Sequence, residues 1–505
     1  MFNHAKSARA DTYRPAPPFI SIGFAAMIVV SGCASVSKQP NLSLIQEQVE
    51  QRINSTVRWN TGVEAEEEVA ESIQKLLEEP LAADDAVQIA LLNNRRLQAV
   101  YEELGVSQAA VVDASLTTNP RFHGGVTFGH AAGHQATAET SGGASEYTFE
   151  FGIDFLSALY SRMRTSVAET EYEMAKLRVT AAIMDLAAQT RLAYYRVQSA
   201  EQMLELSRQI AEATNTGYEF TQRLFDAGNI IELDLLLQQS FSGDAKLNLA
   251  SAELEVAESR EGLNALMGLW GESVSWSIAP RLPDAPANPM ELEHLEKTAI
   301  ENSIDLALAR QKIIAMGKRL GIAKATKLVP SLDLGMEIER ASGEWATGPA
   351  IGFEIPLFNW NQAKVDSATS ELRRGQQEFY ALAVEIRAAV RAARRRLATA
   401  RQAAVYYQNE ILPLRYKIVV QVQLQYNAMQ VGTPRLLLAK QQEIGAGRTY
   451  VQSLYNYHAA RVELEQILAG RLPKSTSAIG SIPSFANTES LPDGSSEATL
   501  GHGGH

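Results

Sequence analysis

The feature that most constrains this chain is an internal repeat. Three residues recur at the same spacing about 209 positions later: Ala90, Asn93 and Leu97 reappear as Ala299, Asn302 and Leu306. Asn119-Pro120 has a counterpart in Val329-Pro330, and the turn at 225–229 is echoed at 428–433. Each copy predicts a helix, a strand hairpin, a very long helix, a tight turn and a return helix. The repeat therefore predicts two interleaved halves of one elongated body rather than several compact domains.

Charge and motif content exclude several function classes. The net charge is -12, with 46 basic and 58 acidic residues, and no dense Lys/Arg stripe carries interleaved aromatics, which speaks against nucleic acid as a partner. The nearest case, Arg391 with Arg394–Arg396, spreads around a helix and favours a solvated face. The sequence has no phosphate-binding glycine loop, His-Glu-x-x-His motif or nucleophile elbow, so we expect no enzyme activity.

The only cysteine, Cys33, ends an N-terminal targeting pattern. Lys6, Arg9 and Arg14 precede an apolar stretch at 19–30 that is too short to span a bilayer comfortably. The following Val30-Ser31-Gly32-Cys33-Ala34 resembles a bacterial lipoprotein signal, in which the cysteine is acylated. An ordinary signal peptide with a chance cysteine is the alternative. We expect a diacylglycerol group and an acyl chain such as palmitate on Cys33, and Ala34 favours sorting to the outer membrane.

Alternating segments predict two strands in each half. Residues 147–155 place aromatic and aliphatic side chains at odd positions and acidic or small ones at even positions. Residues 122–128, 331–338 and 349–357 alternate in the same way. This suits a strand between lipid and a wet lumen, but also a soluble sheet with one buried face. Four short strands cannot close a barrel, so membrane strands would require several chains to share one.

Very long helical segments follow each strand pair. Residues 157–224 contain no proline and no glycine before Gly217, which predicts a helix of roughly 100 Å, and 231–267 would return. The second half predicts a helix over 361–429, interrupted only by Gly375 and Pro413, and a return over 434–468. Residues 86–116 predict one helix that stops at Asn119-Pro120. A soluble coiled-coil scaffold has similar helices.

The doubled order, the Ala/Asn helix starts, the strand pairs, Ile355-Pro356-Leu357-Phe358-Asn359 and the two turns resemble the TolC-like outer membrane efflux family over residues 81–472. The resemblance implies a mostly α fold with a small membrane β part. It implies a homotrimer with a shared twelve-stranded β-barrel on a long periplasmic α-helical barrel. Residues 427–472 further resemble the subset found beside heavy-metal, especially copper, systems.

The function implied is passive conduction from the periplasm to the exterior. A periplasmic adaptor would dock on the helical tips, and an inner-membrane pump, of the RND type in this family, would supply the energy. A type I secretion outlet differs only in its partners. A lipidated periplasmic adaptor is the alternative class, but it should carry a lipoyl-like all-β segment around a single helical hairpin.

The resemblance assigns roles to the two tips. Val431-Gly432-Thr433 is similar to the family's adaptor-docking turn, and Ala227-Gly228-Asn229 matches it more loosely. Glycine would permit a tight turn and close backbone approach there, although a plain turn is the alternative. Glu232 and Asp234 fall where the family places a cation-selective gate, but solvated carboxylates at a helix start would look the same. The second half has no acid there before Glu443, which departs from the family pattern.

The remaining expectations concern boundaries and metal. His502 and His505 are candidate copper or zinc ligands, although such a tail is more often only flexible, and we expect no other cofactor. The expected segments are a signal peptide at 1–32, an N-terminal periplasmic segment at 33–80, the first repeat at 81–272, a proline-punctuated linker at 273–290, the second repeat at 291–472, and a disordered tail at 473–505.

Overall fold

A computed structural model describes residues 42–60, 62–128, 145–286, 293–328, 331–341, 344–354 and 358–473. The described residues form two compact units. The sheet unit takes its residues from Gly105–Glu169 and Val329–Phe358, and the helical unit from Asn41–Leu104, Thr170–Leu328 and Asn359–His505. Each half of the chain contributes to both units.

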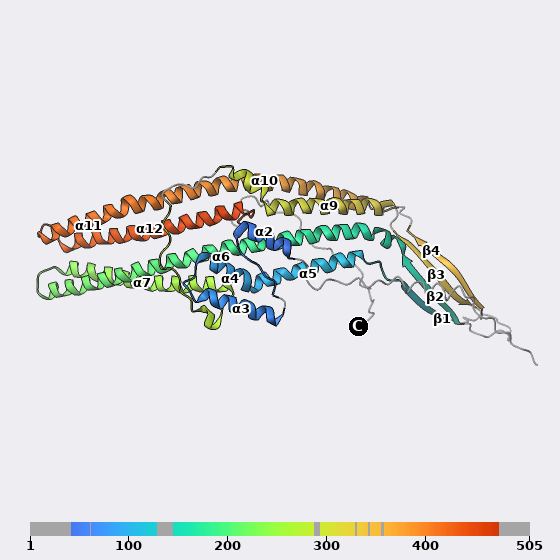
Figure 1. Ribbon diagram of the computed structural model, residues 1–505, viewed down its shortest axis with the longest axis horizontal. Helices are drawn as coiled ribbons and strands as arrows, with labels where there is room; N and C mark the ends of the chain where they lie inside the picture. The colour runs from blue at the N-terminus through green and yellow to red at the C-terminus, as the bar shows by residue number, and fades with distance from the viewer. Residues whose placement is uncertain are drawn as a thin grey trace, which may run out of the picture. The chain divides into compact units, whose positions relative to one another are not determined.

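The elements follow one another in the order labelled in Figure 1. The helices are α2 (Ser43–Ile53), α3 (Val63–Leu77), α4 (Ala83–Asn93), α5 (Arg95–Ser115), α6 (Phe155–Asp226), α7 (Glu232–Met267), α8 (Leu295–Glu301), α9 (Ile304–Leu328), α10 (Gln362–Tyr406), α11 (Leu412–Asn427) and α12 (Thr433–Leu468). The strands are β1 (Arg121–Phe128), β2 (Ser145–Asp154), β3 (Leu332–Ala341) and β4 (Glu344–Phe353). Short 3-10 and π turns lie at Gly271–Val274 and Tyr407–Ile411.

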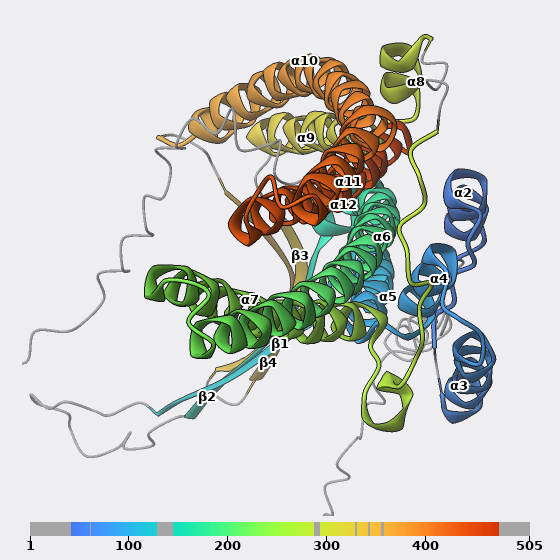
Figure 2. The same ribbon diagram turned by 90° about the vertical axis from the view of Figure 1, so that its left-hand side faces the viewer.

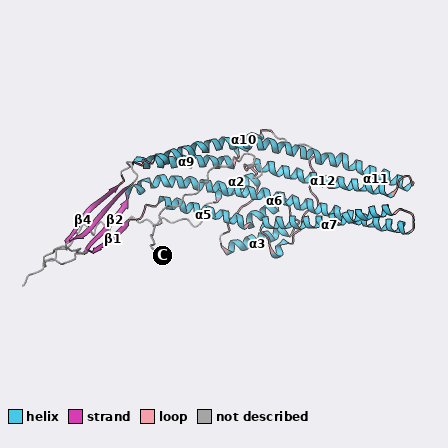
Figure 3. Cartoon of the chain, turned by 180° about the vertical axis from the view of Figure 1, so that it is seen from behind, coloured by secondary structure: helices cyan, strands magenta, loops and turns pink. Residues whose placement is uncertain are grey.

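The sheet unit joins both strand hairpins into one antiparallel sheet of order β1-β2-β3-β4, shown in magenta in Figure 3. Phe122 pairs with Phe151, which pairs in turn with Met336, so these three side chains share a face. On the opposite face His123 pairs with Glu150 and Glu150 with Glu337. The predicted alternation is thus confirmed, with one apolar face and one acidic face.

The strand boundaries differ from those expected. β4 begins at Glu344, five residues before the expected start, because it pairs with β3 from Ala341 onward. Phe155 was expected to extend the second strand, but it is the first residue of α6. The Asp154 Oδ1 accepts a hydrogen bond from the Ser157 N–H at 3.0 Å, as an N-cap does, so the helix starts at Phe155.

The prediction of one helix over 86–116 is wrong, because the structure has two helices there, α4 and α5. The backbone leaves the helical region at Asn94, which separates α4 from α5. The Asn94 Oδ1 accepts a hydrogen bond from the Leu97 backbone N–H at 3.0 Å, as an N-cap does. The Asn94 Nδ2 donates to the Leu266 carbonyl at 2.8 Å. The break therefore lets one asparagine start a new helix and hold the end of α7.

Pro413 explains an interruption in the second long helix. α10 and α11 are separated by a π turn at Tyr407–Ile411 that ends just before this proline. Proline lacks a backbone N–H, and its ring collides with the carbonyl four residues earlier in a regular helix. A locally wider turn accommodates both effects. The first half has no such proline, and α6 runs unbroken for 72 residues.

The repeated asparagines have the same role in both halves. Asn93 Nδ2 donates to the carbonyls of Met267 and Gly268, at 3.0 and 2.8 Å, at the end of α7. Asn302 Nδ2 donates to the Leu468 carbonyl at 3.2 Å, at the end of α12. The last carbonyls of a helix lack partners within it, so each asparagine satisfies the end of a return helix.

The helical unit contains two hairpins, α6–α7 and α11–α12, which lie side by side in Figures 1 and 2. The hairpins meet through α6 and α12, where the Arg448 guanidinium donates to Ser207 Oγ at 3.0 Å and Gln466 Nε2 donates to Asp185 Oδ1 at 3.1 Å. Towards the tips α7 also faces α12, since Phe241 and Asn248 of α7 line a cavity of about 340 Å³ with Ile444 of α12. None of the described helices has a window long and apolar enough for a membrane span.

The described part of the linker crosses the helices in an extended strap. Gln198 Nε2 on α6 donates to the Ala279 carbonyl at 3.0 Å, and the Arg401 Nε on α10 donates to the Pro286 carbonyl at 2.9 Å. The His458 Nε2 on α12 donates to the Pro283 carbonyl at 2.8 Å. Residues 279, 283 and 286 lie outside helices and strands, so side chains rather than backbone N–H groups bind their carbonyls.

Candidate docking tips and gate

The first tip is a glycine-terminated helix end. The Asn229 N–H bonds to the Leu224 carbonyl at 2.9 Å and the Gly228 N–H to the Phe225 carbonyl at 2.8 Å, which is the Schellman arrangement. Gly228 has φ +73°, in the left-handed region that side chains disfavour. The expected role of glycine in this turn is therefore present at Gly228.

The second tip makes the same turn without a glycine. The Gln430 N–H bonds to the Gln425 carbonyl and the Met429 N–H to the Tyr426 carbonyl, both at 2.9 Å. Met429 has φ +57° and is 94% exposed. It is the structural counterpart of Gly228 and carries the backbone strain that a glycine would avoid.

Gly432 has a different place from the one expected. Its φ of −83° lies outside the left-handed region, and it is the N-cap residue of α12. The corresponding N-cap in the first hairpin is Ile231, with φ −85°. The tight turn therefore does not require glycine at 432, and the physical reason expected for it is wrong. Val431 and Thr433 flank it at the exposed end of the hairpin.

The two candidate gate carboxylates lie in the first turn of α7. Glu232 is exposed, and Asp234 lines a cavity of about 190 Å³ between the two tips with Gly432 and Thr433. In the equivalent hairpin register, Thr433 occupies the position of Glu232 and Arg435 that of Asp234. The carboxylates are favourably placed at a helix N-terminus. The chain thus has acids at one tip and a base at the corresponding position of the other.

Gln238 is a residue of this region that the sequence pattern did not single out. Its side chain is buried, and its Nε2 donates to the Thr214 carbonyl of α6 at 3.1 Å. A Cβ on Gly217 would lie 2.7 Å from that nitrogen, so a larger residue there would displace the Gln238 amide from this contact. The Gln238 Oε1 has no hydrogen-bond partner among the described residues. A glycine inside a long helix was the available signal for a close approach.

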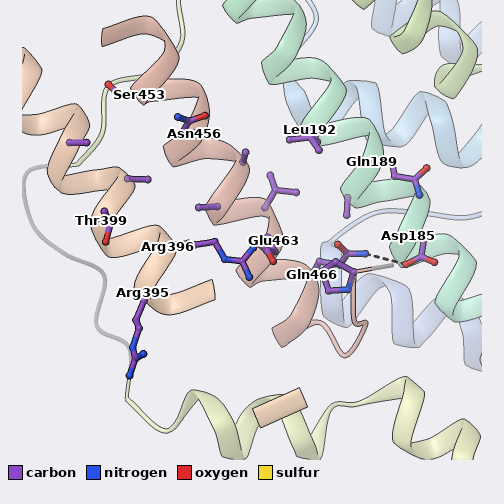
Figure 4. Close-up of a pocket in the computed structure, with 17 residues that line it drawn as sticks. Asp185, Gln189, Leu192, Arg395, Arg396, Thr399, Ser453, Asn456, Glu463 and Gln466 are labelled. Atoms are coloured by element: carbon purple, nitrogen blue, oxygen red, sulfur yellow. Dashed lines mark hydrogen bonds and ion pairs between the residues drawn. The ribbon is translucent and has the colours of Figure 1, made fainter. Parts of the chain in front are cut away.

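A larger cavity, of about 840 Å³, lies between α6, α10 and α12 in the helical unit (Figure 4). Several polar groups in its wall already have partners within the chain. The Arg396 guanidinium pairs with Glu463 at 2.9 Å, and the Asp185 carboxylate accepts a hydrogen bond from Gln466. Asp185 also pairs with Arg471 at 3.0 Å. These contacts stabilise the meeting of the hairpins and supply no nucleophile with an adjacent base.

The predicted lipid-attachment and metal-binding residues all lie outside the described part of the chain. Among the described ranges, no three His, Cys, Asp or Glu side chains are grouped so that they could hold a metal ion. Cys33, with the signal peptide, and His502 and His505, with the tail, lie outside the described residues. The segment Ile355-Pro356-Leu357 also lies outside them.

Comparison with known sequences identifies relatives. Residues 86–269 match the family model described as outer membrane efflux protein. The cobalt-zinc-cadmium resistance protein CzcC of Cupriavidus metallidurans is 25% identical over 342 residues, which cover 66% of this chain and 77% of CzcC. The cation efflux system protein CusC of Escherichia coli K12 is 25% identical over 312 residues, 57% of this chain and 64% of CusC. The alignment thus spans slightly less than two thirds of CusC.

Solved structures show the same fold. A crystal structure of CusC superposes with a TM-score of 0.63 at 17% identity, covering 77% of this chain and 92% of that one. The Campylobacter jejuni CmeC outer membrane channel gives 0.59 at 16% identity, with 79% and 88% covered. The open state of the Neisseria gonorrhoeae MtrE outer membrane channel gives 0.60 at 17% identity, with 77% and 89% covered. The expected TolC-like arrangement of long helices and a small sheet is confirmed.

Proposed function

Because residues 86–269 match the family model described as outer membrane efflux protein, we propose that the chain is a member of that family and the outer membrane channel of a tripartite efflux system. Three copies form the channel. It conducts passively from the periplasm to the exterior once a periplasmic adaptor and an inner-membrane pump of the RND type have docked.

The observation that carries this proposal is the sheet. One face is apolar and exposed, and in a single chain its Phe122, Ile351 and Phe353 side chains would contact water. The other face carries the carboxylates of Glu150, Glu337 and Asp333. β1 and β4 each have a strand partner on one side only among the described strands. Unpaired backbone groups cannot face lipid, so the edges must pair with other copies. Three four-stranded sheets give a closed wall of twelve strands, apolar outside and acidic inside.

The long hairpins form the periplasmic part of the conduit in this proposal. Six hairpins, two from each copy, surround one axis and present their tips to the adaptor. Ala227, Gly228 and Asn229 dock it at one type of tip, and Val431, Gly432 and Thr433 at the other. Glu232 and Asp234 form the periplasmic gate. The two halves of the chain, 81–272 and 291–472, then occupy equivalent places around the axis.

Heavy-metal cations are the proposed cargo, and copper is one candidate among them. Supporting this are the names of two relatives, which refer to cobalt, zinc and cadmium resistance and to cation efflux. The acidic face of the sheet would also attract cations to the lumen. Anchoring by acylated Cys33 completes the proposal, with the acyl chains in the outer membrane.

Two measurements test this function. A strain that lacks the chain should lose resistance to one or more of cobalt, zinc, cadmium and copper, and a plasmid copy should restore it. The purified protein in detergent should run as a trimer in size exclusion with light scattering. Unchanged resistance to all four metals would remove the proposed cargo, whereas a stable monomer would contradict the channel itself.

The alternative classes predict other outcomes. A lipidated adaptor or a coiled-coil scaffold would remain in the periplasmic extract after removal of its lipid anchor by Cys33→Ser, because nothing else would hold it in a membrane. The channel should stay in the outer membrane fraction when Cys33 is replaced, since its strands span the bilayer. If the chain were a type I secretion outlet, a strain that lacks it would keep its metal resistance but would no longer export a protein.

A further inference from the structure

Two neighbouring cavities lie where α7 faces α12, towards the ends of the two hairpins (Figure 1). The larger, of about 340 Å³, lies between α6, α7 and α12, and the smaller, of about 190 Å³, lies nearer the tips. Gln238, Phe241 and Leu437 line both, so the two cavities adjoin at these side chains. Part of the boundary between the hairpins within one chain is therefore unfilled.

The sequence of α7 explains why this boundary is poorly filled. Asp234, Phe241 and Asn248 are seven residues apart, as are Gln238 and Ala245, so all five lie along one side of the helix. Large aliphatic side chains usually fill such a stripe where two helices pack. Here an acid, two amides and an alanine accompany a single phenylalanine, which leaves space and brings polar groups to it.

Gln238 has a buried hydrogen-bond acceptor without a partner. The residue is 2% exposed, and its Nε2 donates to the Thr214 carbonyl, but its Oε1 has no partner among the described residues. Ser242, one turn further along α7, is 4% exposed, and its Oγ also has none among them. A buried acceptor that loses its bonds to water is destabilising unless another donor replaces them. The site therefore favours a ligand that carries a hydrogen-bond donor.

The charges available to a ligand are negative. Asp234 lines the smaller cavity and Asp244 the larger, and neither makes an ion pair with another residue of the described ranges. The two bases of the lining, Lys440 and Arg448, already bind side chains of α12 and α6. A positively charged donor would thus meet two carboxylates and one amide oxygen, whereas an anion would meet no unpaired base.

The rest of the lining is largely apolar. Phe241 is common to both cavities, and Ile210, Leu437 and Ile444 add aliphatic surface. The face of an aromatic ring attracts a cation, and aliphatic walls favour a ligand with a hydrocarbon body. A metal ion fits less well, because the described residues contain no group of three His, Cys, Asp or Glu side chains that could hold one.

We propose that these cavities bind an amphipathic organic amine. Its ammonium group lies between Gln238 Oε1 and the Asp234 carboxylate, and its hydrocarbon body lies along Phe241, Leu437 and Ile444. An alkylamine has a pKa close to that of lysine, about 10.4, so it is charged at neutral pH. The larger cavity has the size of sites that bind small organic molecules, about 300–1,000 Å³.

The inference goes beyond the proposed function, because the site requires neither metal cargo nor an adaptor. The amine would contact α6, α7 and α12 at once. Binding to this arrangement of the hairpins stabilises it relative to any arrangement in which α7 and α12 separate. Amines of this class would therefore hold the two hairpins of a chain together near their tips.

The test compares three probes of similar shape and different charge. Phenethylamine carries the ammonium group, phenethyl alcohol replaces it with a neutral hydroxyl, and hydrocinnamate carries a carboxylate. Binding to the full-length protein in detergent is measured at pH 7.5 by titration calorimetry, with detergent alone as the blank. We expect a Kd below about 1 mM for the amine and at least about tenfold weaker binding of the other two probes.

Two glycines provide matched variants that test the location. Gly445 lines the larger cavity and Gly243 lines neither, and an added Cβ meets nothing within 4 Å at either position. Leucine favours a helix more than glycine does, so both variants should fold. Gly445→Leu should occupy the cavity and weaken the binding of phenethylamine at least about tenfold, whereas Gly243→Leu should leave it within about twofold.

Polar variants test the orientation of the amine. Asp234→Asn keeps the shape of the side chain without its charge, and it should weaken phenethylamine at least about fivefold but phenethyl alcohol by less than about twofold. Gln238→Leu removes the unpartnered oxygen and should weaken the amine by a similar factor. Glu232→Gln changes an exposed acid of the same helical turn that lines neither cavity, and it should leave the binding of both probes unchanged.

Three results would overturn the inference. If phenethylamine gives no heat beyond the detergent blank up to about 10 mM, the cavities hold only water. Equal affinity for the three probes would mean that the site does not recognise the ammonium group. Equal affinity of Gly445→Leu and the wild type would place the amine elsewhere on the protein. None of these results depends on trimer formation or metal resistance, so they leave the proposed function untouched.

Discussion

At the scale of single residues, small differences between the two tips have distinct physical causes. The same hydrogen-bonded turn is built around Gly228 in one hairpin and around Met429 in the other, although both residues have positive φ. An L-residue in that region is disfavoured by about 1–2 kcal/mol. The second tip therefore stores strain that the first does not.

Met429→Gly should relieve this strain. Because the side chain of Met429 is 94% exposed, its removal costs almost no packing. We expect the free energy of local opening around 424–435 to rise by about 1 kcal/mol, measured by amide hydrogen exchange. The reciprocal change, Gly228→Ala, should lower local stability at the first tip by a similar amount. Equal exchange in Met429→Gly and wild type would show that the turn is unstrained.

The two capping asparagines should differ in importance. Asn93→Ala removes two hydrogen bonds from partly buried carbonyls at the end of α7 and should lower the free energy of unfolding by about 1–3 kcal/mol. Asn302→Ala removes one longer bond at an exposed site and should cost less than about 1 kcal/mol. Denaturant midpoints of the two variants would check the order, and a larger loss for Asn302→Ala would contradict this assignment.

His458 should make the linker strap sensitive to acid. Its Nε2–H donates to the Pro283 carbonyl, its Nδ1 has no partner among the described residues, and burial lowers its pKa below the ordinary 6.5. The nearby Arg461 lowers the pKa further, while the bond to Pro283 and the Glu465 carboxylate oppose the shift, and Tyr195 and Tyr457 complete its surroundings.

A lowered pKa in the fold means that the neutral ring is the stabilising form. Stability from His458 is therefore complete above pH 6.5 and is lost as the pH falls through the lowered value. Thermal midpoints at pH 7.5 and 5.5 should differ less in His458→Gln than in the wild type. An identical pH dependence in both proteins would assign the effect to other groups.

At the scale of elements, proline chemistry separates the two long helices. Pro413→Ala restores a backbone N–H and removes the clash that the π turn at Tyr407–Ile411 accommodates. We expect slower hydrogen exchange over 405–417, equivalent to about 1–3 kcal/mol. Leu414→Ala, an exposed change at the next position, should not slow exchange there. If Pro413→Ala exchanges as the wild type does, packing rather than proline fixes the π turn.

The type and order of these elements could be predicted from the sequence, but their junctions could not. Alternation in 147–155 predicted a strand because its two faces have different chemistry, and the absence of proline from 157–224 predicted an unbroken helix. The break at Asn94 depends on carbonyls about 170 residues away, which local spacing does not contain. Likewise, a glycine was expected to mark each tip, but the second turn uses Met429, and Gly432 only begins the next helix.

At the scale of the whole molecule, the chain has surfaces that one copy leaves uncovered. The apolar face of the sheet and the outer faces of α7 and α11 expose large hydrophobic side chains of different kinds. On the sheet these side chains suit lipid, because Arg340, near the end of β3, is the one charged residue that the pairing of the described strands places on that face. On α7 they are accompanied by seven acidic and two basic residues, and on α11 by Arg415 and Lys417. The candidate gate residues could be predicted as acids near a turn. That the basic Arg435 of α12 occupies the position of the acidic Asp234 of α7 became apparent only when the two helix starts were compared.

The two faces of the sheet should respond differently to the same new charge. Ile351 lies on the apolar face and is exposed, so Ile351→Arg would place a cation against lipid at a cost of about 2–4 kcal/mol near the bilayer centre. Three residues earlier on β4, Gly348 pairs with Glu337 on the acidic face, and a Cβ there meets nothing within 4 Å. Gly348→Arg therefore makes the same change in charge on the opposite face. We expect Ile351→Arg to reduce the trimer recovered from the outer membrane fraction several-fold and Gly348→Arg to leave it unchanged. Equal recovery of both variants would mean that the apolar face does not meet lipid.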